Sequence, residues 1–251
     1  HISNMKKILT TALAISCAAM AYAKDIKGTV KDTEGNALSG VVVSDGLNTV
    51  LTDAKGKWKM EADDDSRFVF ISTPSGYISS TLEGETLFYK EIKEGVRKYE
   101  FVVEKNSKDD TKHNVIVIAD PQISERSELA DLSKQADDMA EFVKSMDGDY
   151  TFGICLGDIV GWDHSIYPEY NSIMSKPGFE YRYVIGNHDM TNWGRSYETS
   201  MKNYEDMYGP AWYSFNVGDV HYIMLNDNFY VGRDYFYIGY LDERQLRWLE
   251  R

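Results

Sequence analysis

Three short polar segments follow three apolar, strand-like stretches of the sequence. Asp120 and Gln122 come directly after the first stretch, Asp158 after the second, and Asn187 and His188 after the third. Because ligands collect outside the carboxyl ends of the strands in open α/β sheets, we expect the three segments to converge on one site. Carboxylate, amide and imidazole groups are ligands expected for Mn, Fe or Zn. The sequence therefore predicts a metal centre here.

Two glycines precede these polar residues. Gly157 comes before Asp158, and Gly186 comes before Asn187. Glycine tolerates turns in which the backbone approaches a site closely, because it carries no Cβ atom. We therefore expect tight backbone contacts at both positions.

The elements that must position these residues form a predicted α/β layered domain. Residues 115–119 are a continuous apolar run, which indicates a strand buried on both faces. Further strands are expected at 151–156, 181–185 and 220–225. Three- and four-residue apolar spacing predicts a helix over 129–146, and the stretches 165–175 and 197–208 are also helical in character. Strands that alternate with helices are typical of α/β layers.

A last helix is predicted at the C-terminal end of the sequence. Asp242 would cap it, with Gln245 three residues later as in a capping box. Leu246 and Leu249 are then expected to face the core. A core-facing helix at the end of the chain suggests a C-terminally truncated domain, so we expect residues 113–251 to be only the N-terminal part of the catalytic domain.

An all-β pattern occupies the preceding region. Short apolar alternations separated by Gly, Asp and Asn predict a small β-sandwich over residues 24–105. Residues 106–112 are polar and charged and are predicted to be a linker. The expected strands are 26–30, 41–44, 58–60, 68–71 and 99–103.

The N-terminus has the three parts of a secretory signal peptide. Lys6 and Lys7 precede a short apolar run, and small residues end in the A-x-A pattern at Ala23, so residues 5–23 are predicted to be removed. Residues 1–4 precede the first methionine and are interpreted as a cloning or gene-finding remnant. We expect an exported protein, periplasmic or extracellular. A lipid anchor on Cys17 is the second alternative, because Ala14 stands where a lipobox prefers Leu.

Composition narrows the possible partners. The chain has 251 residues, 43% of them hydrophobic, and a formal net charge of −13. Such a charge argues against a general nucleic-acid binder, which needs a basic face. No stretch after the leader is long enough to span a membrane. A phosphate ester remains a possible substrate, because bound metal ions supply positive charge locally.

The three polar segments in their order resemble the first three motifs of calcineurin-like metallophosphoesterases, D-x-(H or Q), G-D and G-N-H-(D or E). The resemblance covers 115–251. It implies that Asp120 binds a first metal ion, that Asp158 bridges two ions and that Asn187 binds the second. Gln122 stands where most members have a histidine ligand, which would alter the first ion's ligand field. The metal identity, Mn, Fe or Zn, stays open.

The same resemblance implies a metal-dependent hydrolysis of a phosphomonoester or phosphodiester. A metal-activated hydroxide would attack phosphorus, while His188 contacts the phosphate or protonates the leaving oxygen. Asp189 would orient His188. The substrate would be a phosphorylated small molecule, lipid or protein, and oligomeric state is not predicted.

Residues 28–56 also resemble the carboxypeptidase-regulatory-like sandwich that often precedes exported phosphoesterases. The G-H-x-H loop that supplies the family's last metal ligands is absent from this sequence, so we expect weak metal binding and poor turnover from this chain. The alternative from another class is a non-catalytic exported binding protein with a relic phosphoesterase domain.

Overall fold

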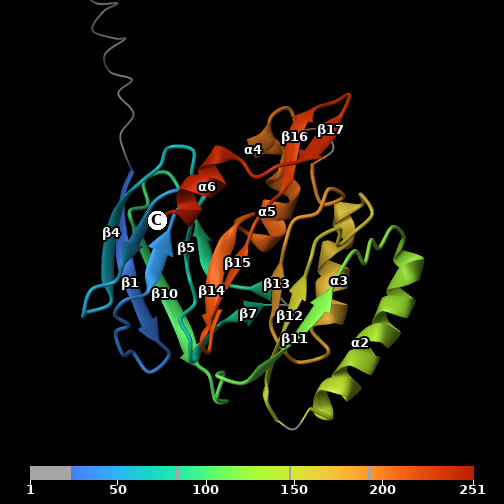
Figure 1. Ribbon diagram of the computed structural model, residues 1–251, viewed down its shortest axis with the longest axis horizontal. Coiled ribbons are helices and arrows are strands. Elements are labelled where there is room, and N and C mark those ends of the chain that lie inside the picture. Colours follow the sequence, from blue (N-terminus) through green and yellow to red (C-terminus); the bar gives the residue numbers. More distant parts are fainter. Residues whose placement is uncertain (1–23, 83–84, 147, 192–193) are drawn as a thin grey trace, which may run out of the picture.

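A β-rich N-terminal part is followed by a part in which strands and helices alternate (Figure 1). The computed structural model describes residues 24–82, 85–146, 148–191 and 194–251, so the predicted leader and remnant over 1–23 lie outside the described residues. The N-terminal strands are β1 (Lys24–Asp32), β2 (Val42–Ser44), β3 (Thr49–Leu51), β4 (Lys57–Ala62), β5 (Phe68–Ile71), β6 (Tyr77–Ser79), β7 (Thr81–Leu82), β8 (Glu85–Thr86), β9 (Tyr89–Glu91) and β10 (Lys98–Lys105).

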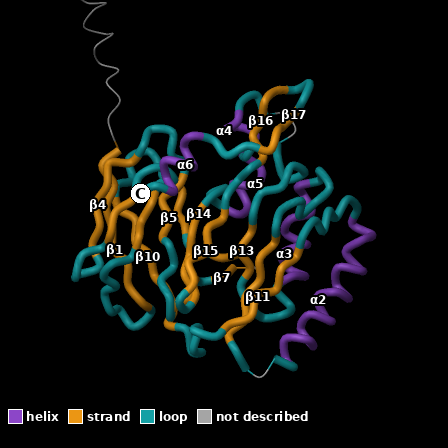
Figure 2. Tube along the Cα trace, viewed as in Figure 1, coloured by secondary structure: helices purple, strands orange, loops and turns teal. Residues whose placement is uncertain are grey.

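Every strand predicted in this part is found, with bounds shifted by a few residues. Two four-stranded sheets result, in the orders β4-β1-β10-β6 and β3-β2-β5-β9. Figure 2 shows β4, β1 and β10 of the first sheet side by side. Exposed and buried residues alternate along β4 and β10, as expected for strands with one face on a core. Strand β5 is buried on both faces, so a further layer must cover its sheet.

The second part of the chain supplies that layer. The ring of Phe70 on β5 lies 6.3 Å from that of Trp248, and the ring of Phe88 lies 4.4 Å from that of Tyr213. The predicted linker is tied down as well, because the buried Asp110 carboxylate accepts a 2.6 Å hydrogen bond from the Gly76 N–H. The N-terminal sheets are therefore packed against the second part of the chain.

Strands and helices alternate in the second part, as the sequence predicts. Its parallel sheet has the order β11-β12-β13. The elements are β11 (His113–Ile118), η1 (Arg126–Glu128), α2 (Leu129–Lys144), β12 (Tyr150–Cys155), η2 (His164–Ile166), α3 (Tyr167–Met174), β13 (Tyr181–Tyr183), α4 (Tyr197–Ser200), α5 (Lys202–Tyr208), β14 (Tyr213–Val217), β15 (Val220–Met224), β16 (Asn228–Gly232), β17 (Phe236–Gly239) and α6 (Glu243–Leu249).

The parallel sheet has a different neighbour on each face. On one face, Tyr170 of α3 contacts Cys155 of β12. On the other, Phe152 of β12 packs edge-to-face against Phe215 and Tyr222 of the β14–β15 hairpin. Figure 1 shows α2 and α3 beyond the sheet and the hairpin between the sheet and the N-terminal strands. Strand β12 is buried at all six residues as a result.

Strand β11 corrects one expectation. The apolar run predicted burial on both faces, yet its residues are only half-buried and Val117 is 57% exposed. Strand β11 lies at the edge of the sheet and pairs with β12 alone within the described residues. An apolar run shows that a strand suits a buried sheet but does not tell whether both of its sides are covered.

Helix α6 corrects a second expectation, which concerns the face that it turns towards the core. Asp242 caps it as predicted, accepting hydrogen bonds from the N–H groups of Arg244 and Gln245. Leu246 and Leu249, however, are 45% and 39% exposed and do not face the core. A different face of the helix is buried. The side chains on that face are Gln245 and Trp248.

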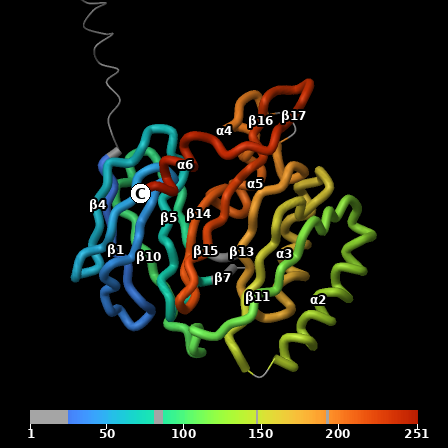
Figure 3. The backbone as a smooth tube through the Cα atoms, in the orientation of Figure 1, coloured from blue at the N-terminus to red at the C-terminus, as the bar shows by residue number. Residues whose placement is uncertain are grey.

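The buried face of α6 has partners from distant parts of the chain. The Trp248 Nε1–H donates to Ser44 Oγ at 3.0 Å, and the Gln245 Nε2–H donates to the Asn226 carbonyl at 2.8 Å. Figure 3 shows α6, near the C-terminus, beside the N-terminal strands. Within the described part of the chain, no helix has the length and apolar character needed to cross a membrane.

Candidate metal centre

The three predicted polar segments lie next to one another at the carboxyl edge of the sheet β11-β12-β13. The Gln122 N–H donates to the Asp158 carbonyl at 2.7 Å. The Gln122 Nε2–H donates to Asp158 Oδ2 at 3.2 Å, and the His188 N–H donates to Asp158 Oδ1 at 2.8 Å. Asp158 is thus the residue that joins the first segment to the third.

The backbone of this site is strained. Asp120, Gln122 and Asp158 have φ angles of 56°, 44° and 50°, in the left-handed region. Such a conformation costs roughly 1–3 kcal/mol for a residue with a side chain, and it tends to cluster at functional sites. The remaining non-glycine residues with positive φ in the described chain are Trp162 and Phe236.

The two glycines provide the close approach that the sequence predicts. A Cβ atom on Gly186 would lie 2.1 Å from both the N and the Oδ1 atoms of Asp158. A Cβ atom on Gly157 would lie 2.6 Å from the Gly186 nitrogen, and Gly157 also has a φ of +87°. Only glycine fits at either position without a shift of the neighbouring backbone.

Asp120 and Asn187 belong to the first and third polar segments, and their side chains have no polar partner among the described residues. Asp120 is exposed and Asn187 is half-buried. Neither side chain makes a hydrogen bond or an ion pair within the described residues. Their oxygens are therefore available to a cation.

Asp189 is placed differently from the role that the family resemblance implies. Its fully buried carboxylate accepts hydrogen bonds from the N–H groups of Ile159 (3.1 Å) and Gly186 (2.9 Å) and from the Tyr167 hydroxyl (3.0 Å). Burial raises the pKa of Asp189 to about 7, although these hydrogen bonds act in the opposite direction. Asp189 thus ties the second and third segments together, and the His188 ring is not among its hydrogen-bonding partners.

The His188 ring instead lies against an aromatic residue. Its centroid is 4.4 Å from that of Trp162, which in turn is 5.5 Å from Phe236 on the β16–β17 hairpin. The Nδ1 atom of His188 is buried and has no hydrogen-bond partner among the described atoms. His164 Nε2 lies 2.9 Å from the His188 carbonyl oxygen and fixes the backbone there. Burial lowers the pKa of His164.

Sequence patterns identify neither Tyr167 as a partner of Asp189 nor Trp162 as a partner of the His188 ring. The one available signal was position, since Trp162 and His164 follow the Gly-Asp segment within six residues. Nothing in the sequence indicates the contact of Phe236 with Trp162, because this contact depends on how the β16–β17 hairpin packs.

The side chains at this site carry the types of oxygen atom that bind metal ions. Asp120 and Asp158 supply carboxylate oxygens, and Gln122 and Asn187 supply amide oxygens, which are ligands for hard cations. Within the described residues, no group of three or more His, Cys, Asp or Glu side chains is arranged to hold a metal ion. Any metal binding here would therefore depend on the two amides as well as on the carboxylates.

The β-rich part of the chain resembles a known protein family. Residues 24–106 match the family model described as the N terminal of Calcineurin-like phosphoesterase. This match supports the calcineurin-like phosphoesterase superfamily, and it covers the β-rich part rather than the residues of the candidate metal centre. No curated protein matches the chain.

Proposed function

We propose that this chain belongs to a metal-dependent phosphoesterase that hydrolyses a phosphomonoester or phosphodiester. The observation that carries the proposal is the contact of Asp158 with both Gln122 and His188, at adjacent ends of parallel strands. The match of residues 24–106 to the N-terminal domain of a phosphoesterase family supports it independently.

In this proposal Asp120, Gln122, Asp158 and Asn187 hold two divalent or trivalent ions, Mn, Fe or Zn. When bound, such ions polarise phosphoryl oxygens and make a bound water more acidic. Each carboxylate oxygen of Asp158 accepts one hydrogen bond and keeps a lone pair, so this carboxylate could still take part in holding the ions.

His188 would bind the phosphate and give a proton to the leaving oxygen. That proton would leave from Nε2, because Nδ1 is buried without a partner among the described atoms. Trp162 packs against the ring and would limit its movement. Asp189 acts on the loop backbone and thereby on the position of the His188 main chain.

The first test is metal content, because poor turnover is expected from a chain that lacks the G-H-x-H loop. Because weak binding is also expected, we would dialyse the purified chain to equilibrium against a buffer that contains Mn²⁺ and determine the bound metal by elemental analysis. Asp158→Asn should lose most of the bound metal, whereas Asp131→Asn, on the exposed face of α2, should keep it. Equal metal in all three proteins would contradict the proposal.

Export is part of the same proposal. The segment 5–23 would direct the chain to the periplasm or the exterior, and cleavage would leave Lys24 as the first residue. N-terminal sequencing of the chain recovered from outside the cytoplasm of an expressing bacterium tests this. Recovery of the uncleaved chain in the cytoplasm alone would argue against it.

A further inference from the structure

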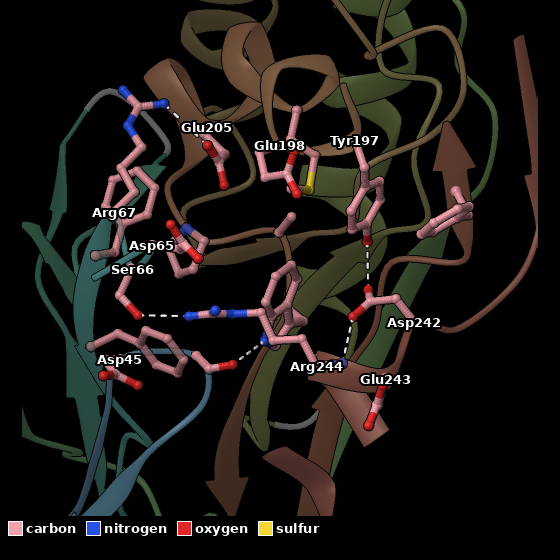
Figure 4. A pocket seen from close by; sticks show the side chains of 18 residues that line it. Asp45, Asp65, Ser66, Arg67, Tyr197, Glu198, Glu205, Asp242, Glu243 and Arg244 are labelled. Carbon is pink, nitrogen blue, oxygen red and sulfur yellow. Dashed lines mark hydrogen bonds and ion pairs between the residues drawn. The ribbon is translucent and has the colours of Figure 1, made fainter. Parts of the chain in front are cut away.

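A cavity lies between the N-terminal sheets and the helices of the second part. Its volume is about 410 Å³, and β5 and the β2–β3 turn line one side while α4, α5 and α6 line the other (Figure 4). None of the six predicted site residues lines it. Neither the metal centre nor the proposed hydrolysis uses this cavity.

Apolar and aromatic side chains form much of its wall. These side chains are Phe68, Phe70, Met201, Trp212 and Phe229. All of them except Phe229 are buried, so the wall is fixed by the core rather than by surface groups. The Trp212 Nε1–H donates to the Gly46 carbonyl at 3.0 Å, which holds that indole in place. Aromatic rings attract cations through the negative charge on their faces.

The charged groups around the cavity are mostly acidic. Both guanidinium groups are already neutralised, because Arg67 pairs with Glu205 at 3.2 Å and also with Asp206, and Arg244 pairs with Asp63 at 2.7 Å. An anionic ligand would therefore have to displace carboxylates. The charged residues that line the cavity are Asp45, Asp65, Arg67, Glu198, Glu205, Asp242, Glu243 and Arg244.

Two of the carboxylates have no partner of their own within the described residues. Asp45 binds N–H groups of its turn, and Asp242 caps α6. The Asp65 and Glu198 carboxylates, by contrast, make no ion pair or hydrogen bond in the described part of the chain, and both are exposed at the cavity. Figure 4 shows Asp65 on the sheet side and Glu198 on the helix side.

We infer that this cavity binds an organic monocation with an apolar body about one ring in size. The ammonium group lies between Asp65 and Glu198, and the body contacts Phe68, Trp212 and Phe229. The volume is near the lower end of the range of about 300–1,000 Å³ that is usual for small-molecule sites. Charge complementarity selects a cation, because the free charges are carboxylates and the guanidiniums are paired.

Phenethylammonium is the probe, and 3-phenylpropionate is its anionic counterpart of similar shape. Binding would be followed by NMR through the Trp212 indole N–H resonance, assigned by its loss in Trp212→Phe. The cation should shift this resonance in a saturable way, with an affinity at least about tenfold higher than that of the anion. Equal affinity for the two probes, or no shift with the cation, would overturn the inference.

Two variants test whether the cation binds at this cavity or is attracted non-specifically by the negative charge of the protein. Glu198→Gln removes one free carboxylate without touching the capping box of α4, which Ser196 and Thr199 form, and should weaken cation binding about five- to tenfold. Glu141→Gln, on the exposed side of α2, should leave it unchanged. Equal losses in both variants would overturn the site, as would Mg²⁺ shifting the same resonance where phenethylammonium does not.

Discussion

Backbone strain at the candidate metal centre is offset by specific contacts. The Gln122 N–H and Nε2–H both donate to Asp158, so two residues with positive φ hold each other in place. Asp189 adds three hydrogen bonds from Ile159, Gly186 and Tyr167. Strain of this kind persists only where the surroundings fix it, so small changes at these residues should have large effects.

Gly186→Ala should be among the most damaging small substitutions in the chain. Its Cβ would lie 2.1 Å from two atoms of Asp158, one of them backbone, so the Asp158 segment must move. We expect a loss of about 1–3 kcal/mol in the free energy of unfolding and a loss of bound Mn²⁺. Gly239→Ala is the matched control, because no atom lies within 4 Å of its added Cβ. Urea denaturation and metal analysis of both variants check this, and similar losses in the two would contradict it.

Cys155 should not react in the folded protein. It is fully buried in β12, and burial raises the pKa of its thiol to about 12. A thiol reacts as its thiolate, so a chain that begins at Lys24 should show no reactive thiol towards a disulfide reagent at pH 8. One equivalent should react in denaturant. Rapid reaction without denaturant would show that β12 is open to solvent.

At the scale of helices and strands, local structure can be predicted from the sequence, whereas contacts between distant segments cannot. The strands of the parallel sheet, the helices that follow them and the polar residues at the ends of β11, β12 and β13 could be predicted from apolar spacing, whereas β14, β16 and β17 were not predicted. The buried face of α6 could not be predicted, because Trp248 and Gln245 are buried through hydrogen bonds with Ser44 and Asn226, which lie far from them in the sequence. The same holds for Trp162, because neither its φ of 93° nor its contact with His188 follows from a pattern in the sequence.

The contact of Glu205 on α5 with Arg67, the residue before β5, should make stability depend on pH. Burial raises the pKa of Glu205 from 4.5 to about 7 despite its pairing with Arg67. The folded state therefore keeps a proton that the unfolded state has released between about pH 4.5 and pH 7. Its contribution to stability is fully present below pH 4.5 and falls as the pH rises towards 7.

Glu205→Gln should remove this part of the pH dependence. Between pH 4.5 and pH 7 the wild type should lose more stability than the variant, by at most about 3 kcal/mol. Asp189 titrates in the same range, so the difference between the two proteins, rather than either slope, is the quantity to compare. Urea denaturation across this range measures it, with Glu141→Gln as the control. Parallel curves for the wild type and Glu205→Gln would contradict the prediction.

At the scale of the whole molecule, Arg182 joins the two parts of the chain. Its guanidinium is 1% exposed and lies 5.1 Å from the Phe88 ring centroid and 4.5 Å from that of Phe215. Its Nη2 atom lies 3.4 Å from Thr73 Oγ1 and 3.6 Å from Glu180 Oε1. One buried cation thus contacts both the N-terminal sheets and the second part.

Arg182→Met should lower the free energy of unfolding by about 3–5 kcal/mol, because it leaves the buried Glu180 carboxylate without its cation. Adding Glu180→Gln should recover part of the loss. Lys176→Met removes a surface ion pair with Asp137 and should cost no more than about 1 kcal/mol. Chemical denaturation compares the variants. A loss in Arg182→Met no larger than in Lys176→Met would show that the buried pair contributes little.

The exposed edge of β11 has a consequence for handling the protein. Its outer backbone groups have no strand partner in the described chain, and its sequence, HNVIVI, has four branched apolar residues in a row. A strand of this kind can accept a strand from another molecule, and it is a recognised starting point for aggregation. The strand that presents Asp120 and Gln122 is thus also where concentrated solutions of the chain should begin to self-associate. Metal binding and light scattering should therefore be measured on the same samples.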